Sequence, residues 1–161
     1  MENPIIVQTG EIKTGKKGDI LKSSPIGSCV LVVLFDRHVK MGGMAHVMLP
    51  GKAPVKEGVI PARYAVNSID QLIQQFSREG ISKEKLMAVI VGGGNVLRRK
   101  YDTIGADNIS AVSRQLKGKQ IEIKANSVSG TQRKSARFDV GKGRIFVAAG
   151  DDNETILYDV L

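Results

Sequence analysis

Apolar residues in this chain gather in short runs that glycines and charged residues separate. Residues 5–13 (IIVQTGEIK) and 19–23 (DILKS) read as short strands joined by a turn rich in glycine and lysine. Residues 29–35 (CVLVVLF) form a continuous, largely β-branched apolar run, which predicts a buried strand better than a helix of seven residues. A second apolar segment at residues 43–49 follows closely enough to pair with it as a hairpin.

Two later segments have the spacing of amphipathic helices. Between Pro61 and Gly80, the apolar positions recur at helical offsets, on the stripe formed by Ala65, Ile69, Leu72, Ile73 and Phe76. Proline near the start and glycine at the end are typical helix boundaries. A second stripe, made by Ile109, Val112 and Leu116, predicts a helix that ends near Gly118.

The other apolar runs predict strands. One predicted strand, at residues 86–91 (LMAVIV), leads into three glycines, and another, at residues 121–125 (IEIKA), follows the second helix. Residues 137–140 and 144–148 are predicted to form a hairpin, and residues 155–160 a last strand. Because strands outnumber helices and several connections are short, we expect an α/β fold. The prediction is one layered sandwich domain over residues 1–161, with a mixed, largely antiparallel sheet and two main helices.

Composition narrows the function classes. The chain has 161 residues and a formal net charge of +8, which raises the possibility of nucleic-acid binding. However, the basic residues are scattered apart from the run at 98–100, and aromatic residues make up only 4% of the chain. A solvated basic face is therefore favoured, with no nucleic-acid partner. No apolar stretch is long enough to cross a bilayer and no signal segment is evident, so we expect a cytoplasmic protein without membrane insertion.

The single cysteine, Cys29, is the first candidate for chemistry. One cysteine and two histidines cannot form an internal disulfide and are few for a zinc site, so we expect no metal and no cofactor. Small residues precede the thiol at Gly27 and Ser28, as in a loop that exposes a nucleophile. The backbone amides of Ser28 and Cys29 are candidate donors to a substrate oxyanion. The alternative is a buried cysteine with a structural role only.

His46 is the candidate base. If residues 29–35 and 43–49 pair about a turn centred between Arg37 and His38, Cys29 lies directly opposite His46. A thiol beside an imidazole acts as a nucleophile without metal, although a register slip of one residue would separate the two side chains. His38 is a competing base, but its position in the predicted turn favours a solvent-exposed side chain.

Two further features have weaker support. Ser23, six residues before Cys29, is a candidate third group that orients the imidazole through its hydroxyl or its carbonyl, but spacing alone favours an ordinary strand or turn serine. The glycines at 92–94 lack the lysine that a phosphate-binding loop requires, so we interpret them as a tight strand exit or a point of close approach.

The sequence resembles the CheD family in several segments that occur in the same order. They are GSCV at 27–30, GGMAHVMLP at 42–50, RYAVNSIDQLI at 63–73, VGGGNVL at 91–97, IGADNISAV at 104–112 and SGTQRKSARFDVGKGRIFV at 129–147. The resemblance implies an α/β sandwich related to the catalytic domain of cytotoxic necrotizing factor toxins. It also implies deamidation of chemoreceptor glutamines by a Cys-His-Thr triad.

By matching positions, the resemblance makes Cys29 the nucleophile and His46 the base, and it aligns Ser23 with the family threonine. The lead-in at residues 23–26 (SSPI) departs from the family pattern, and Pro25 removes a backbone donor there. The implied partners are chemoreceptor cytoplasmic domains as substrate and a CheC-like phosphatase. The alternative function is an adaptor that binds these partners with secondary or no catalytic activity.

Overall fold

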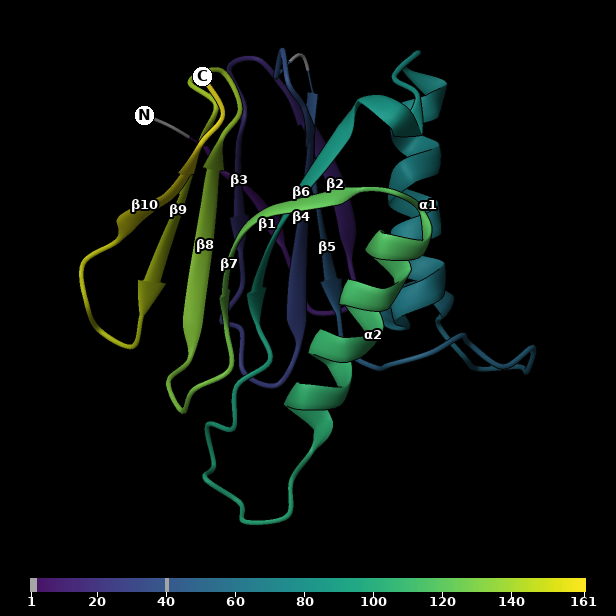
Figure 1. Cartoon of the computed structure of the whole chain (residues 1–161), viewed down its shortest axis with the longest axis vertical. Coiled ribbons are helices and arrows are strands. Elements are labelled where there is room, and N and C mark those ends of the chain that lie inside the picture. Colours follow the sequence, from purple (N-terminus) through teal and green to yellow (C-terminus); the bar gives the residue numbers. More distant parts are fainter. Residues whose placement is uncertain (1–2, 40) are drawn as a thin grey trace.

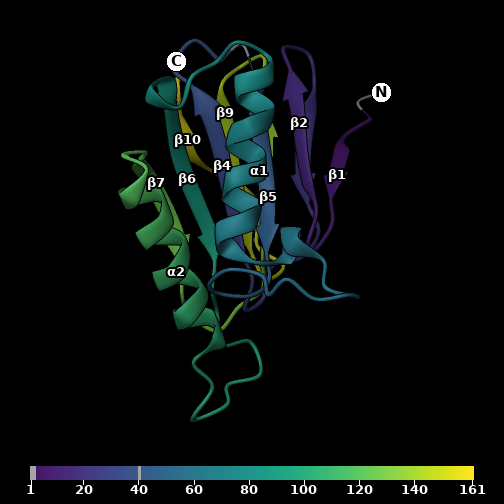
Figure 2. The ribbon, with the colours of Figure 1, turned by 90° about the vertical axis from the view of Figure 1, so that its right-hand side faces the viewer.

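The computed structural model describes residues 3–39 and 41–161 as three layers. Two five-stranded sheets stack face to face, and the two α-helices cover the outer face of one of them (Figures 1 and 2). The α/β class with two main helices is confirmed. The strands, however, divide between two sheets, where the sequence predicted one.

The first sheet contains both ends of the described chain, in the order β1-β3-β8-β9-β10. Its strands are β1 (Ile5–Val7), β3 (Ile20–Ser23), β8 (Lys134–Asp139), β9 (Arg144–Ala149) and β10 (Thr155–Asp159). All neighbours are antiparallel except β1 and β3, which are parallel. The predicted hairpin near the C-terminus is confirmed as β8 and β9.

The second sheet lies between the first sheet and the helices, in the order β2-β5-β4-β6-β7. Its strands are β2 (Ile12–Lys16), β5 (Met41–Val47), β4 (Val30–Asp36), β6 (Leu86–Gly92) and β7 (Glu122–Val128). Every residue of β4 is buried, because one face of this central strand meets the helices and the other meets the first sheet. This explains why its sequence is a continuous apolar run without alternation.

Residues 5–13, predicted as one strand, contribute to both sheets. The chain leaves the first sheet after Val7 and enters the second at Ile12, with Gly10 between them at a φ of 80°. This positive φ reverses the backbone locally, and glycine adopts it without steric cost. The predicted strand therefore becomes a connection between the layers.

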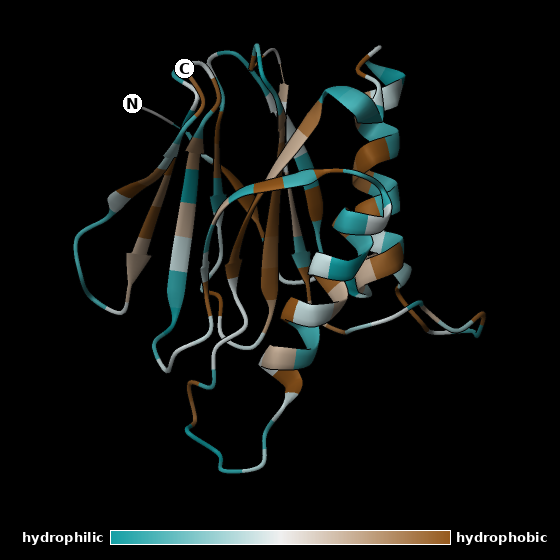
Figure 3. Cartoon of the chain, viewed as in Figure 1, coloured by the Kyte–Doolittle hydropathy of each residue, from teal (hydrophilic) through white to brown (hydrophobic). Residues whose placement is uncertain are grey.

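The helices are α1 (Ala65–Arg78) and α2 (Ile104–Gly118), with short 3-10 turns η1 (Pro61–Arg63) and η2 (Lys83–Lys85). The predicted stripe of α1 is buried at Ile69, Leu72 and Phe76 against the second sheet. Hydrophilic and hydrophobic residues alternate along both helices, as expected for amphipathic helices (Figure 3). No helix of the described residues has the length and apolar character needed to cross a membrane.

Candidate active site

Cys29 and His46 come from neighbouring parts of the second sheet, but not in the predicted register. Leu31, rather than Cys29, lies directly opposite His46, so the predicted register is wrong by two residues. The hairpin turn lies further along the chain than expected, with the amide of Val39 donating to the carbonyl of Asp36 at 2.9 Å.

A shift of two residues preserves the face of a strand, whereas a shift of one would reverse it. His46 and Leu31 share a face of the sheet because they are directly opposed, and Leu31 belongs to the core between the two sheets. Cys29, which is half-buried just before β4, packs against the same core. The thiol and the imidazole therefore face the same space between the sheets, as diagonal rather than direct neighbours.

His46 is held firmly by its main chain. Its amide donates to the carbonyl of Glu11 at 3.0 Å, and its carbonyl accepts from the amide of Gly10 at 2.9 Å. The side chain is fully buried, with Nδ1 at 3.3 Å from the hydroxyl of Ser24. Nε2 is buried and has no hydrogen-bond partner among the described residues. This nitrogen is the one available for proton exchange.

The hydroxyl that contacts His46 belongs to Ser24, whereas the sequence pointed to Ser23. The buried Ser23 hydroxyl instead accepts a hydrogen bond from the amide of Ala136 at 3.0 Å, across to β8. Ser24 follows the end of β3, where the chain crosses from the first sheet to the second, and its amide donates to the carbonyl of Val7. Adjacent serines in extended backbone point to opposite sides, so spacing alone did not separate them.

The loop that contains Cys29 is held against the end of β6. The amide of Gly93 donates to the carbonyl of Cys29 at 2.7 Å, and that of Gly94 donates to the carbonyl of Gly27 at 2.9 Å. A Cβ atom at Gly92 would lie 2.4 Å from the Cys29 carbonyl oxygen. The three glycines thus form a strand exit that allows the backbone of the cysteine loop to approach closely.

Asn108, on α2, joins the cysteine loop to the end of β5, and sequence reasoning missed it. Its side chain is fully buried, and Nδ2 donates to the carbonyls of Ser28 at 3.0 Å and Met48 at 2.9 Å. The helix reaches this position because Gly105 packs on Gly93, where a Cβ atom would meet the Gly93 oxygen at 2.5 Å. The available signal was a polar residue four positions before Val112 on the buried helix face.

Burial favours the uncharged form of both the Cys29 thiol and the His46 imidazole. Burial raises the pKa of the Cys29 thiol, which a hydrogen bond from its own backbone amide partly offsets. Burial lowers the pKa of His46, while a hydrogen bond with the Val7 backbone and the charge of Glu11 act in the opposite direction. The arrangement therefore suits a neutral imidazole that takes a proton from a neutral thiol, rather than a preformed thiolate–imidazolium pair.

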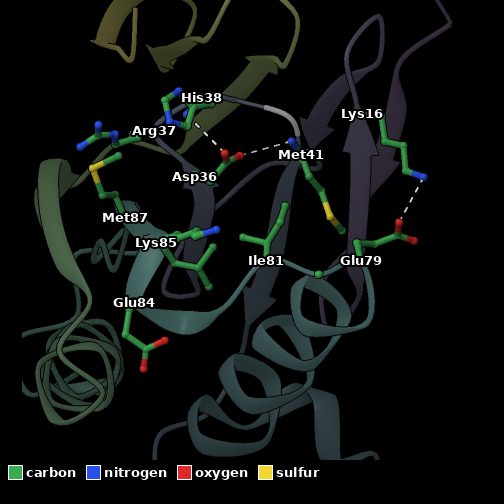
Figure 4. Close-up of a pocket in the computed structure, with 12 residues that line it drawn as sticks. Lys16, Asp36, Arg37, His38, Met41, Glu79, Ile81, Glu84, Lys85 and Met87 are labelled. Carbon is green, nitrogen blue, oxygen red and sulfur yellow. Dashed lines mark hydrogen bonds and ion pairs between the residues drawn. The ribbon is translucent and has the colours of Figure 1, made fainter.

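The second histidine, His38, and a separate cavity lie away from Cys29 and His46. A cavity of about 600 Å³ opens at the other end of β4, where Asp36, His38, Met41 and Lys85 are among the lining residues (Figure 4). His38 is exposed there, as its turn position predicted, with its amide donating to the Asp36 carboxylate. Among the described residues, no three His, Cys, Asp or Glu side chains gather as they would around a metal ion.

These features define a class: a layered α/β protein with a cysteine loop and a strand histidine facing one space between two sheets. The chain belongs to the CheD family, since the family model described as CheD chemotactic sensory transduction matches residues 48–149. That match begins two residues after His46, so neither Cys29 nor His46 lies within it. Full-length relatives extend the similarity across both.

Two curated relatives illustrate that similarity. The probable chemoreceptor glutamine deamidase CheD of Chlorobium luteolum is 36% identical over 96% of this chain and 77% of its own length. The chemoreceptor glutamine deamidase CheD of Thermotoga maritima is 31% identical over 88% of this chain and 89% of its own. Among solved structures, the structural match to the hypothetical protein YfiH of Bacillus licheniformis covers 67% of this chain and 47% of the YfiH chain, with 14% sequence identity and a TM-score of 0.41.

Proposed function

We propose that this protein deamidates glutamine side chains of chemoreceptors to glutamate, with release of ammonia. The observation that carries the proposal is the buried His46, whose Nε2 has no partner among the described residues and which shares a sheet face with Cys29. Membership of the CheD family and the names of the relatives supply the substrate class.

The first step forms a covalent intermediate. The neutral imidazole of His46 accepts the thiol proton of Cys29 at Nε2, and the sulfur attacks the carbonyl carbon of the glutamine side chain. The C=O electron pair moves to oxygen and gives a tetrahedral oxyanion. When that oxyanion collapses, the C–N bond breaks, and ammonia departs with the proton that His46 returns, leaving a thioester.

The second step restores the enzyme. His46 takes a proton from a water molecule, and the resulting hydroxide attacks the carbonyl carbon of the thioester. The C–S bond breaks, His46 returns its proton to the departing sulfur to restore the Cys29 thiol, and the new carboxylic acid ionises to glutamate by releasing a proton to solvent. Each turnover consumes one water, releases one ammonia and gives the receptor one additional negative charge. In this scheme, Ser24 holds the imidazole ring through Nδ1, which leaves Nε2 for the reacting proton.

The backbone amide of Cys29 is the proposed donor to the oxyanion. This amide belongs to the residue that carries the thiol, so it lies beside the sulfur that attacks the substrate. A trans peptide directs its carbonyl and its amide to opposite sides. By holding the Ser28 carbonyl, Asn108 therefore fixes the direction of the Cys29 amide. We assign Asn108 as a positioning residue, since it acts through this peptide and not on the substrate.

The surroundings of the thiol suit a protein substrate. Cys29 is half-buried and does not line the cavity at the other end of β4. A glutamine on the surface of a receptor helix requires an accessible nucleophile rather than a deep pocket. We infer that the protein acts in the cytoplasm, where the cytoplasmic domains of chemoreceptors present such helices.

Ammonia release from purified receptor cytoplasmic domains tests the proposal, with mass spectrometry to locate glutamines converted to glutamates. Wild-type protein should release ammonia, and Cys29→Ala should release none while keeping its thermal unfolding transition. Activity that survives in Cys29→Ala would refute the thiol mechanism. If wild-type protein binds receptors but releases no ammonia, the adaptor function is favoured instead.

A further inference from the structure

The connection between β6 and α2 presents large apolar side chains to solvent. Leu97 is 67% exposed, Tyr101 is 86% exposed and Ile104 is 49% exposed. We call residues 95–104 the projecting loop, because this segment extends furthest from the lower end of the sheets in Figures 1 and 2. Exposed apolar side chains gathered on one connection are typical of a contact surface.

Cations lie among these apolar residues. Arg98, Arg99 and Lys100 are all exposed, and within the described residues none of them forms an ion pair with a carboxylate. The Lys100 ammonium lies 5.7 Å from the centroid of the Tyr101 ring. The only tight basic run of the sequence therefore stays available to an acidic partner, next to apolar side chains.

The projecting loop is ordered by its own hydrogen bonds. The side chain of Asn95 donates to the carbonyl of Arg99 at 2.7 Å and accepts from the Arg99 amide at 3.0 Å. At the other end, the Asp102 carboxylate accepts from the amide of Ile104 at the start of α2. The cations thus stand on a defined turn, so a partner that contacts them is placed at a fixed position relative to the protein.

The projecting loop begins beside the nucleophile. Gly93 and Gly94, which immediately precede it, donate to the carbonyls of Cys29 and Gly27, and a Cβ atom at Gly27 would lie 3.7 Å from the side chain of Val96. The segment between β5 and η1 leaves the same end of the sheets (Figure 1) and adds exposed apolar side chains at Val55 and Ile60. A segment bound along the projecting loop would therefore pass close to the thiol.

We propose that the projecting loop selects the substrate by docking an acidic amphipathic helix of the chemoreceptor beside its target glutamine. This inference rests on the proposed function and specifies its substrate class. An amphipathic helix presents an apolar stripe with carboxylates along its border. The apolar stripe of this helix packs on Leu97, Tyr101 and Ile104, and its carboxylates form ion pairs with the cations of the projecting loop. Position beside the nucleophile favours a protein substrate over a nucleic acid or an anionic membrane.

Two synthetic peptides of equal length test the docking. Each carries one glutamine and the same apolar stripe, and the border residues are glutamate in one peptide and lysine in the other. Wild-type protein should deamidate the glutamate peptide with a kcat/KM about tenfold higher at low salt. The difference should shrink as salt rises, because exposed charges are screened.

Charge reversal assigns the preference to the projecting loop. Arg99→Glu/Lys100→Glu should reverse the preference, so that the lysine peptide becomes the better substrate. Arg98, whose φ of 52° lies in the left-handed region, is left unchanged so that the backbone of the turn is not altered. The matched control is Arg37→Glu/Lys85→Glu, which makes the same change in net charge at the other end of β4 and should keep the wild-type preference.

The remaining outcomes separate this inference from the proposed function. If both double variants change the preference equally, the overall charge and not the projecting loop selects the substrate, and the inference is wrong. If wild-type protein deamidates neither peptide, fluorescence anisotropy of the same peptides with Cys29→Ala measures docking without chemistry. Equal affinity for both peptides, together with loss of binding to phosphatidylserine vesicles in Arg99→Glu/Lys100→Glu, would assign the loop to a membrane instead.

Discussion

The two ends of the β4–β5 hairpin differ in a way that bears directly on function. At the turn end, a cavity of about 600 Å³ has charged walls, and two of its lining residues, Lys16 and Glu79, form an ion pair at 3.4 Å. At the opposite end, Cys29 and the buried His46 face the same space between the sheets, and His46 Nε2 and Asn108 Oδ1 are buried without hydrogen-bond partners among the described residues.

Under the proposed function, the reaction takes place at the end of the hairpin that does not contain the 600 Å³ cavity. Largest pockets are a sound first guess for small-molecule sites, because small ligands must be enclosed. A glutamine side chain of another protein is instead presented on the surface of that protein, so it does not need to be enclosed in a pocket. Buried polar atoms without partners are costly in a stable fold, and the proposed mechanism assigns one of them, His46 Nε2, to the reacting proton.

The largest expected difference between the two ends comes from replacing each of the two histidines in turn. We expect His46→Gln to lower kcat by about 10²–10⁴-fold, because the base is lost. His38→Gln, at the cavity end, should leave kcat unchanged. Ammonia release from receptor domains measures both. Equal losses in the two variants, or a larger loss in His38→Gln, would move the chemistry to the cavity.

Asn108→Leu should have the next largest effect. Without the side-chain amide, the Ser28–Cys29 peptide is free to rotate, and kcat should fall by about 10²–10³-fold, as when an oxyanion donor is removed. KM should change little. Alkylation of Cys29 by iodoacetamide, which forms no oxyanion, should keep its wild-type rate. A parallel loss of alkylation would indicate that the variant disrupts the loop as a whole, and would reject the positioning role.

The two serines should separate catalysis from stability. Ser24→Ala should lower kcat about tenfold, the effect of one hydrogen bond of roughly 1.4 kcal/mol on the imidazole. Ser23→Ala should keep kcat and lower the free energy of unfolding by about 1–3 kcal/mol, since the buried amide of Ala136 loses its acceptor. Urea unfolding and steady-state kinetics on both variants check this assignment. The opposite pattern would restore Ser23 as the third group.

The smallest expected effect is on pH dependence. Because burial lowers the pKa of His46 below its usual 6.5, the neutral base persists into mildly acidic solution. The acid limb of kcat/KM should have its midpoint below pH 6.5. A midpoint above that value would mean that a charged imidazole is stabilised, as in a preformed ion pair.

The same lowered pKa has a consequence for stability. The unfolded chain binds a proton at His46 more readily than the folded one, so this contribution to stability is present above the unfolded pKa. It is lost as the pH falls through the folded pKa. Urea unfolding between pH 7 and 5 should therefore show a steeper decline for wild-type protein than for His46→Gln. Equal slopes would contradict burial of a neutral imidazole.

Much of this protein was decided by local sequence. The sequence predicted β4 from its all-apolar run, and it predicted α1 from the stripe of Ile69, Leu72 and Phe76. Both predictions were correct, because a strand buried on both faces is apolar throughout and a helix buried on one face has apolar residues at helical spacing. Cys29 and His46 were identifiable as the only cysteine and one of two histidines. The hairpin that brings them together was also predictable, since a short connection between two apolar runs favours antiparallel pairing.

Only the tertiary structure decided the contacts between distant segments. The hairpin register depended on a turn whose geometry the sequence did not determine, and it fell two residues from the prediction. The contact of the Ser24 hydroxyl with His46 followed from the path of the chain between two sheets, and Asn108 reached the cysteine loop because glycines let α2 approach it. Such contacts join residues far apart in the chain, so no local pattern encodes them, and packing of the complete fold selects among the alternatives.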